Sequence, residues 1–126
     1  MKKIIYIAIM CAFATACGKS DVTVNYPAQY PDTPVNLSPA NNATGMPVPL
    51  TLSWSACKDP QGDPVFYDVV VTGDFGGYTQ SETFTTQTTS VSVYCWTNSY
   101  TWQVTARDNH NNVSQGPIWT FTSGGK

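Results

Sequence analysis

Short runs of alternating apolar and polar residues fill most of the chain after residue 30, and they restrict what it can fold into. Successive side chains of a β-strand point to opposite faces, so a strand that buries one face alternates in hydropathy. The clearest runs are residues 50–54, 66–72 and 100–106, and clusters of Gly, Pro, Asn and Asp separate them. Because no longer window repeats with the period of a helix, the pattern predicts an all-β domain.

Seven such runs fall within residues 31–123, at the spacing of a seven-strand immunoglobulin-like sandwich. The predicted strands are residues 35–37, 50–54, 66–72, 81–86, 89–94, 100–106 and 118–122. Each of the longer runs has an apolar side that we expect to face a core between two sheets. The side chains predicted there are Leu50, Leu52, Trp54, Tyr67, Val69, Val71, Val91, Val93, Tyr100, Trp102, Val104, Ala106, Trp119 and Phe121.

Four parts of the chain resemble the fibronectin type III family, in the form common in secreted bacterial proteins. They are the loop of residues 39–45, the strand with Leu52-Ser53-Trp54, residues 59–69, and the segments 100–108 and 116–122. The resemblance covers about residues 31–123 and implies a fibronectin type III-like domain for residues 31–126. It also implies that Tyr100 is the corner tyrosine whose hydroxyl reaches the backbone upstream. One fold hosts many functions, so no particular activity is implied.

Residues 1–16 are predicted to be a cleaved signal peptide that takes no part in the fold. Two lysines precede an uncharged run at residues 4–14, which is shorter than the roughly 20 residues that span a membrane. Small residues then precede Cys17, as they do at a signal peptidase site. An ordinary secretory peptide, cut near Ala16, is the alternative, and it would leave Cys17 as an odd thiol.

The segment Ala14-Thr15-Ala16-Cys17-Gly18 resembles the lipobox of bacterial lipoproteins. The resemblance implies that Cys17 is acylated, and two or more acyl chains anchor a protein stably in a membrane. Because residue 18 is not the Asp associated with inner-membrane retention, we expect an outer-membrane location in the cell envelope. Residues 17–30 are polar and include a proline, and are predicted to form a flexible tether.

The composition excludes several classes of protein. Only 11% of the residues are charged, with 8 acidic and 6 basic side chains, and no basic cluster marks a nucleic-acid interface. Aromatic residues make up 13% of the chain, which is too many for a disordered protein. We therefore expect no nucleic-acid partner, and nothing in the sequence calls for a cofactor.

Two cysteines, Cys57 and Cys95, lie inside the predicted domain, where oxidation is possible after export. In the expected topology they end strands at opposite ends of the sandwich, roughly 20 Å apart. A disulfide joins Cα atoms no more than about 7 Å apart, so two separate buried thiols are favoured. The register of Cys95 leaves the disulfide open as an alternative.

Acidic loops offer a candidate calcium site. Asp59 and Asp63 are expected to meet Asp108 at one end of the sandwich, with Asp68 nearby, and carboxylate oxygens are the ligands that Ca²⁺ prefers. Asp, Asn and Gly are also the residues that tight turns require. No spacing here matches a complete calcium loop, so turns are favoured, and Asp59, Asp63 and Asp108 stay weak metal candidates.

Catalysis finds few candidate residues. His110 is the only histidine, and it lies in a loop rich in Asn that we expect to be solvated. A nucleophilic site needs a base that a third group orients beside a nucleophile. The sequence gives His110 no such setting, and the protein is predicted not to be an enzyme.

Three aromatic residues have no evident place in the core. Phe75 and Tyr78 lie in a Gly-rich stretch, and Trp96 follows a strand end. Exposed aromatic rings stack on sugars or anchor protein partners, although local packing over the end of the sandwich is the simpler explanation.

The predicted function is a membrane-anchored, non-catalytic binding or spacer module of the cell envelope, held by acylated Cys17, with a protein or glycan partner. The alternative is an accessory carbohydrate-binding lipoprotein of a polysaccharide-uptake system, which would bind sugar through Phe75, Tyr78 and Trp96.

Overall fold

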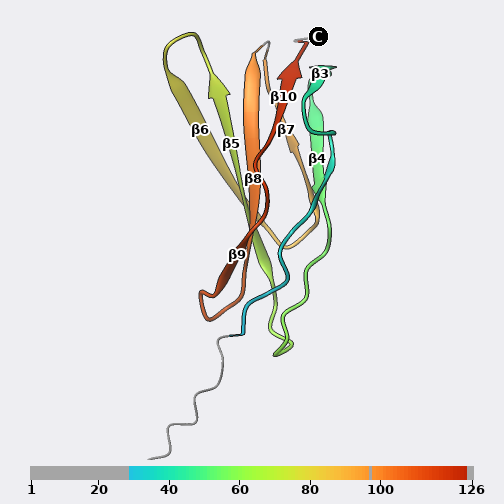
Figure 1. The fold of residues 1–126 in the computed structure, drawn as a ribbon, viewed down its shortest axis with the longest axis vertical. Coiled ribbons are helices and arrows are strands. Elements are labelled where there is room, and N and C mark those ends of the chain that lie inside the picture. The colour runs from blue at the N-terminus through green and yellow to red at the C-terminus, as the bar shows by residue number, and fades with distance from the viewer. Residues whose placement is uncertain (1–28, 97, 125–126) are drawn as a thin grey trace, which may run out of the picture.

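The structure, a computed structural model, describes residues 29–96 and 98–124, which form two β-sheets packed face to face (Figure 1). The predicted all-β sandwich is confirmed. The strands are β2 (Asn36–Ser38), β3 (Ala43–Met46), β4 (Leu50–Trp54), β5 (Phe66–Asp74), β6 (Thr79–Thr86), β7 (Ser90–Val93), β8 (Ser99–Arg107), β9 (Val113–Gln115) and β10 (Trp119–Ser123). The predicted signal peptide, Cys17 and most of the predicted tether lie outside the described residues. Within them, no helix is long and apolar enough to cross a membrane.

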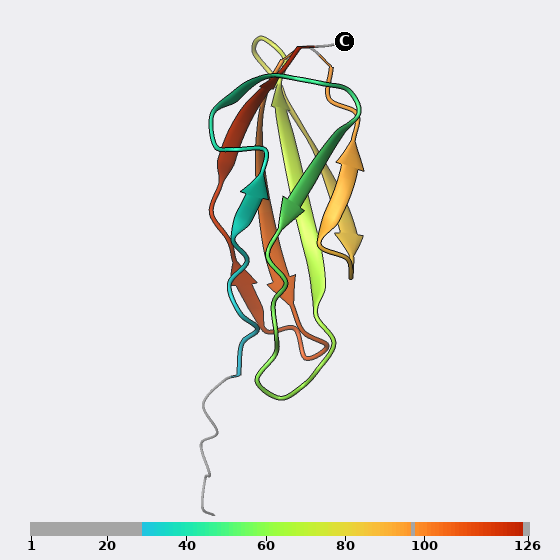
Figure 2. The ribbon, with the colours of Figure 1, turned by 90° about the vertical axis from the view of Figure 1, so that its right-hand side faces the viewer.

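The larger sheet has the order β3-β10-β8-β5-β6, and β9 pairs with β8 next to β10. The smaller sheet has the order β2-β4-β7, and Figure 2 looks onto it. All the pairs are antiparallel except that of β3 with β10, which is parallel. The larger sheet therefore ends at β6 and the smaller sheet at β7.

The seven expected strands are present, and two further segments have joined them. Residues 43–46, expected as part of a loop, form β3 beside β10, where Asn42 N donates to Thr120 O at 2.8 Å. The last strand begins earlier than expected, as β9, and is interrupted at Gly116. A Cβ atom on Gly116 would lie 2.7 Å from the carbonyl oxygen of Pro34, so only glycine fits where these backbones approach.

The core lies between the sheets and contains the residues that the alternation predicted, together with Cys57 and Cys95. All fourteen predicted side chains are buried except Val91 and Trp119, which are partly buried. Trp54 of β4 and Trp102 of β8 are almost fully buried, one from each sheet, and Trp54 packs edge-on against Tyr67 with ring centroids 5.6 Å apart. Two opposed apolar strand faces thus account for the fold.

The sandwich has two different ends. At the N-terminal pole, defined by residues 29–34, 57–65 and 108–112, Asp32 N donates to Lys58 O at 2.9 Å and Ser114 Oγ to Pro31 O at 2.6 Å. At the distal pole, defined by residues 74–78, 94–96 and 98–99, lie the β5–β6 turn and the start of β8. Figure 1 shows the chain entering the domain at the N-terminal pole, with the β5–β6 turn at the opposite end.

Candidate binding site

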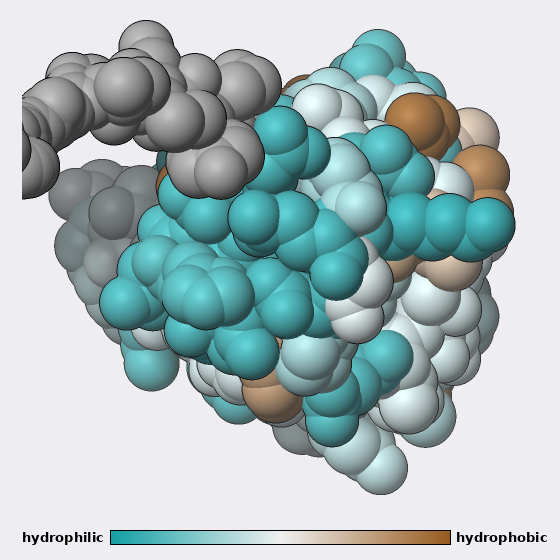
Figure 3. Space-filling view, turned by 90° about the horizontal axis from the view of Figure 1, so that it is seen from below, coloured by the Kyte–Doolittle hydropathy of each residue, from teal (hydrophilic) through white to brown (hydrophobic). Residues whose placement is uncertain are grey.

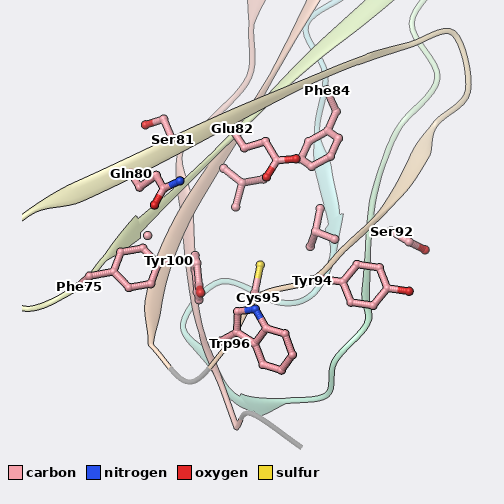
Figure 4. A pocket seen from close by; sticks show the side chains of 13 residues that line it. Phe75, Gln80, Ser81, Glu82, Phe84, Ser92, Tyr94, Cys95, Trp96 and Tyr100 are labelled. Carbon is pink, nitrogen blue, oxygen red and sulfur yellow. The ribbon is translucent and has the colours of Figure 1, made fainter.

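A pocket of about 260 Å³ opens between β6 and β7 in the distal half of the sandwich (Figure 4). We call it the edge cleft. Its lining residues are Val71, Gly73, Phe75, Gln80, Ser81, Glu82, Phe84, Ser92, Val93, Tyr94, Cys95, Trp96 and Tyr100. The volume is below that of most drug-sized ligand sites, and it suits a single side chain or sugar ring.

The cleft exists because β6 extends the larger sheet beyond the edge of the smaller one. In the pairing of β5 with β6, Glu82 is opposite Val71 and Phe84 is opposite Val69. Paired residues project from the same face of a sheet, so Glu82 and Phe84 point to the core side. Nevertheless Glu82 is exposed and Phe84 is only half-buried. In Figure 4 both side chains extend from β6 into the space between β6 and β7.

A row of stacked and edge-on aromatic rings connects the cleft to the core. Tyr78 stacks on Phe75 with centroids 5.7 Å apart, and Phe75 meets Tyr100 edge-on at 6.2 Å. Tyr100 in turn stacks on Phe121 at 5.3 Å. Gly73 makes room for this row, because a Cβ atom there would lie 2.6 Å from the Tyr100 ring and 2.7 Å from the Phe75 ring. The inner rings are fixed by packing, which holds the wall of the cleft in place.

Two exposed rings border the cleft on the β7 side. The side chains of Tyr94 and Trp96 are 70% and 65% exposed. They flank Cys95, whose side chain continues the inward set of Val91 and Val93 along β7. Figure 4 shows the Trp96 indole beside the Cys95 thiol, whereas the Tyr94 hydroxyl points outward. Large rings exposed beside a pocket are the usual anchors of binding surfaces.

Tyr100 lies beside the segment that carries Trp96. Burial raises the pKa of Tyr100, and the nearby Cys95 adds to that increase. The backbone of Trp96, four residues upstream, partly opposes it. That Tyr100 is a corner tyrosine stays a prediction.

Among the residues that the structure describes, Glu82 is the only charged one that lines the cleft. It faces the Cys95 thiol, and it contributes to the raised pKa of that thiol, although burial is the larger cause. The two effects raise the pKa of Cys95 to about 11, so the thiol stays protonated at neutral pH and serves as an apolar wall. Glu82, Cys95 and Tyr94 were not among the ligand-binding residues predicted from the sequence. The in–out alternation along β7 was the available signal for Tyr94 and Trp96.

The structure brings two of the three predicted ligand-binding residues to one cleft. Phe75 and Trp96 both line it, and Tyr78 stacks on Phe75. Phe75 is half-buried by the aromatic row, as the packing alternative required, whereas Tyr78 and Trp96 remain exposed. Ligand binding by these residues stays a prediction.

The N-terminal pole has a different chemistry, which is hydrophilic over most of the surface seen in Figure 3. The two acidic loops meet there as expected, because His110 Nδ1 lies 3.0 Å from Asp63 Oδ2. Asp63, Asp108 and His110 can each direct one ligand atom to within 4.8 Å of the others. Asp59 is not part of this group, and Asp68 pairs instead with Arg107.

The carboxylates at this pole also organise turns. Asp108, which is 0% exposed, accepts hydrogen bonds from the backbone N–H groups of His110 and Asn112 and from the Asn112 side chain. Burial raises its pKa, but these hydrogen bonds outweigh burial and lower it. Asp59 likewise accepts the backbone N–H groups of Gln61 and Asp63 through Oδ2. The turn interpretation therefore accounts for Asp59 and Asp108, and metal binding at Asp59, Asp63 and Asp108 stays a weak prediction.

The two cysteines of the domain are free and buried. Cys57 lies at the N-terminal pole, where its backbone N–H donates to the Tyr67 hydroxyl at 2.8 Å. Cys95 lies at the distal pole, where its carbonyl oxygen accepts a hydrogen bond from Ser123 Oγ. The opposite placement expected from the topology is present, and it keeps the thiols apart.

Comparison with known proteins supports the fold. A scan against protein-family models gives no match, and no curated protein sequence matches. Among solved structures, the solution structure of the fibronectin type III domain of human fibronectin type III domain containing protein 3 matches with a TM-score of 0.54 and 17% sequence identity. The match covers 81% of this chain and 94% of that one. At this identity the likeness shows the fold alone.

Proposed function

We propose that this protein is a lipid-anchored, non-catalytic binding module of a bacterial cell envelope, and that its edge cleft receives the partner. The observation that carries the proposal is the position of the cleft. Its exposed rings, Tyr94 and Trp96, lie at the distal pole, whereas the chain enters the domain at the N-terminal pole. Segments at the ends of a rigid sandwich commonly carry binding sites, and the edge cleft, which lies near such an end, is open to solvent.

Anchoring through Cys17 would determine how the edge cleft is oriented relative to the membrane. Residues 17–30 would tether the N-terminal pole to the membrane, so the hydrophilic surface there would face lipid headgroups (Figure 3). The aromatic cleft would then point away from the bilayer toward components of the envelope. A flexible tether of this length has an r.m.s. span of roughly 20 Å, which keeps the domain close to the membrane.

Two features favour binding over catalysis. His110 is 63% exposed and belongs to a turn, where Asp63 and Asp108 hold it rather than orient it toward a nucleophile. The edge cleft contains one carboxylate, Glu82, and no second carboxylate, histidine or lysine is among its described lining residues. General acid–base chemistry usually needs a pair of such groups.

The alternative, an accessory carbohydrate-binding lipoprotein of a polysaccharide-uptake system, has one observation in its favour. Trp96 offers a solvent-exposed indole face, and Gln80 of β6 lines the same cleft. A stacking ring beside hydrogen-bonding side chains is a common arrangement for holding a sugar. Saturable binding of a neutral envelope oligosaccharide, lost on Trp96→Ala but kept on His110→Ala, would favour this alternative.

The proposal is tested in whole cells with a photo-reactive residue at Tyr78 and, as a matched control, at His110 on the opposite pole. We expect a discrete adduct from position 78 and none from position 110. Equal labelling from both positions would contradict the assignment of the cleft. In parallel, Cys17→Ser should abolish acyl labelling and release the chain into the soluble fraction. Unchanged membrane association of that variant would refute the lipid anchor while leaving the cleft assignment intact.

A further inference from the structure

The charges of the described residues are unevenly distributed. Residues 29–96 and 98–124 contain seven acidic and two basic side chains, a net charge of −5 with His neutral. Both basic residues lie at or next to the N-terminal pole. Lys58 belongs to that pole, and Arg107, which pairs with Asp68, directly precedes its segment 108–112. The distal half carries Asp74 and Glu82 without a described basic residue. Its field attracts cations and repels anions.

The lining of the cleft matches a cation on an apolar stem. The Glu82 carboxylate shares the cleft with the rings of Phe75, Phe84 and Trp96 and with the protonated Cys95 thiol. Aromatic faces attract a lysine or arginine head group, and a carboxylate forms a charge-assisted hydrogen bond with it. A neutral ligand would gain the stacking but not the ion pair.

The strand beside the cleft is open to pairing. β6 pairs only with β5 among the described strands, over eight residues and with no shift of register. Exposed edge strands are usually protected by Pro, Lys or a bulge, and β6 has none of these. Its only charge is Glu82, which is directed inward. An inward-pointing carboxylate disfavours the addition of an apolar strand to β6, whereas it attracts a strand that carries a basic side chain. It therefore favours a basic partner segment.

We propose that the edge cleft binds an extended basic peptide segment, which adds a strand to β6 and inserts one Lys or Arg side chain between Glu82 and the aromatic walls. This inference rests on the proposed function and names the partner's chemistry. Backbone hydrogen bonds along β6 would supply affinity, and the cleft would supply selectivity for the cation. The volume of about 260 Å³ accommodates such a side chain.

The test is a selection of displayed random peptides on the immobilised full chain, purified in detergent, followed by affinity measurements on the enriched sequences. We expect enrichment of a Lys or Arg flanked by β-branched residues. Glu82→Gln keeps the size of the side chain and should lower the affinity for these peptides by about tenfold, which is the effect of losing one charge-assisted contact. Asp32→Asn makes the same charge change at the opposite pole and should alter affinity by less than about twofold.

Two further measurements test the strand addition. Alternate amides of the bound peptide would face β6. N-methylation of those amides should abolish binding, because they can no longer donate hydrogen bonds to β6. Blocked lysine amide alone should bind far more weakly than the peptide. Equal affinity for blocked lysine amide and the peptide, or equal affinity of Glu82→Gln and the parent, would overturn the inference.

The remaining outcomes separate the inference from the proposed function. If no basic peptide is enriched and a neutral oligosaccharide binds and is lost on Trp96→Ala, the peptide inference is wrong and the proposed cleft stands. If neither ligand binds and position 78 gives no adduct in cells, the inference and the proposed function both fail.

Discussion

Asp68 of β5 and Arg107 of β8 are joined by two hydrogen bonds, from Nε to Oδ2 at 2.9 Å and from Nη2 to Oδ1 at 3.2 Å. Thr85 of β6 adds a third bond to Asp68 at 2.7 Å, and the Arg107 guanidinium lies over the Phe66 ring. These contacts connect three neighbouring strands of the larger sheet. The Arg107 hydrogen bonds are the main reason that the pKa of Asp68 is lowered.

The lowered pKa predicts a pH-dependent contribution to stability. A carboxyl group whose pKa is lower in the folded than in the unfolded state stabilises the fold when the pH is above its unfolded-state pKa, about 3.9. This stabilisation is lost as the pH falls through the folded-state pKa. In a double-mutant cycle of Asp68→Asn and Arg107→Gln, we expect a coupling of about 0.5–1 kcal/mol at neutral pH. Denaturant unfolding below the folded pKa should show the coupling disappear. Coupling that is the same at both pH values would contradict the assignment.

The core position of the tryptophans predicts large effects on stability. Trp54→Ala or Trp102→Ala should each lower the free energy of unfolding by about 3–5 kcal/mol, because a large cavity replaces a fully packed ring. Trp96→Ala is the matched control, since that ring is exposed, and it should alter stability little. Thermal melts of the three variants check this. A Trp54→Ala variant that melts with the parent would show that the ring is not in the core.

Cys95 should be unreactive until strongly alkaline pH. Its pKa is raised to about 11 from an ordinary 9.0, and the thiolate is the species that alkylating reagents attack. Alkylation of the folded chain, followed by mass spectrometry of the Cys95 peptide, should accelerate near pH 11, and near pH 9 in denaturant. Because the unfolded thiol ionises first, stability should fall between these values. The same pH profile in both states would show that the thiol is not buried.

The turns at the N-terminal pole should not depend on a metal ion. Asp108 is fully engaged by His110 and Asn112, so a chelator should leave the melting temperature unchanged. Asp108→Asn is the contrasting variant, because an amide would direct N–H toward the Asn112 side-chain N–H, and we expect it to melt earlier. A fall of several degrees with chelator would instead establish the metal site at Asp63, Asp108 and His110.

The faces of the strands were predictable from the sequence, whereas the edges of the sheets were not. Alternation alone places Leu52 or Val104 in the core, because only local geometry is needed. It does not reveal that residues 43–46 pair with β10, which depends on bonds from Thr120 to Asn41 and Asn42 almost 80 residues away. Gly45, which has a φ of +67°, is a residue type typical of turns, so the sequence did not indicate a strand here.

The candidate site was only half predictable for the same reason. Phe75, Tyr78 and Trp96 stood out because they are aromatic residues outside the alternation. Glu82 had no feature that set it apart from other strand residues, and Cys95 was considered only as a possible disulfide partner or a buried thiol. They meet only because the larger sheet ends at β6 and the smaller one at β7, and strand order is a long-range property that a single sequence does not state.

The central claim is that partner binding depends on the edge cleft and not on the N-terminal pole. The most direct measurement is the yield of the adduct formed in cells from a photo-reactive residue at position 78, compared among substituted chains of equal abundance. We predict that Trp96→Ala abolishes the adduct and that His110→Ala leaves its yield unchanged. Loss of the adduct in His110→Ala with full yield in Trp96→Ala would contradict the account.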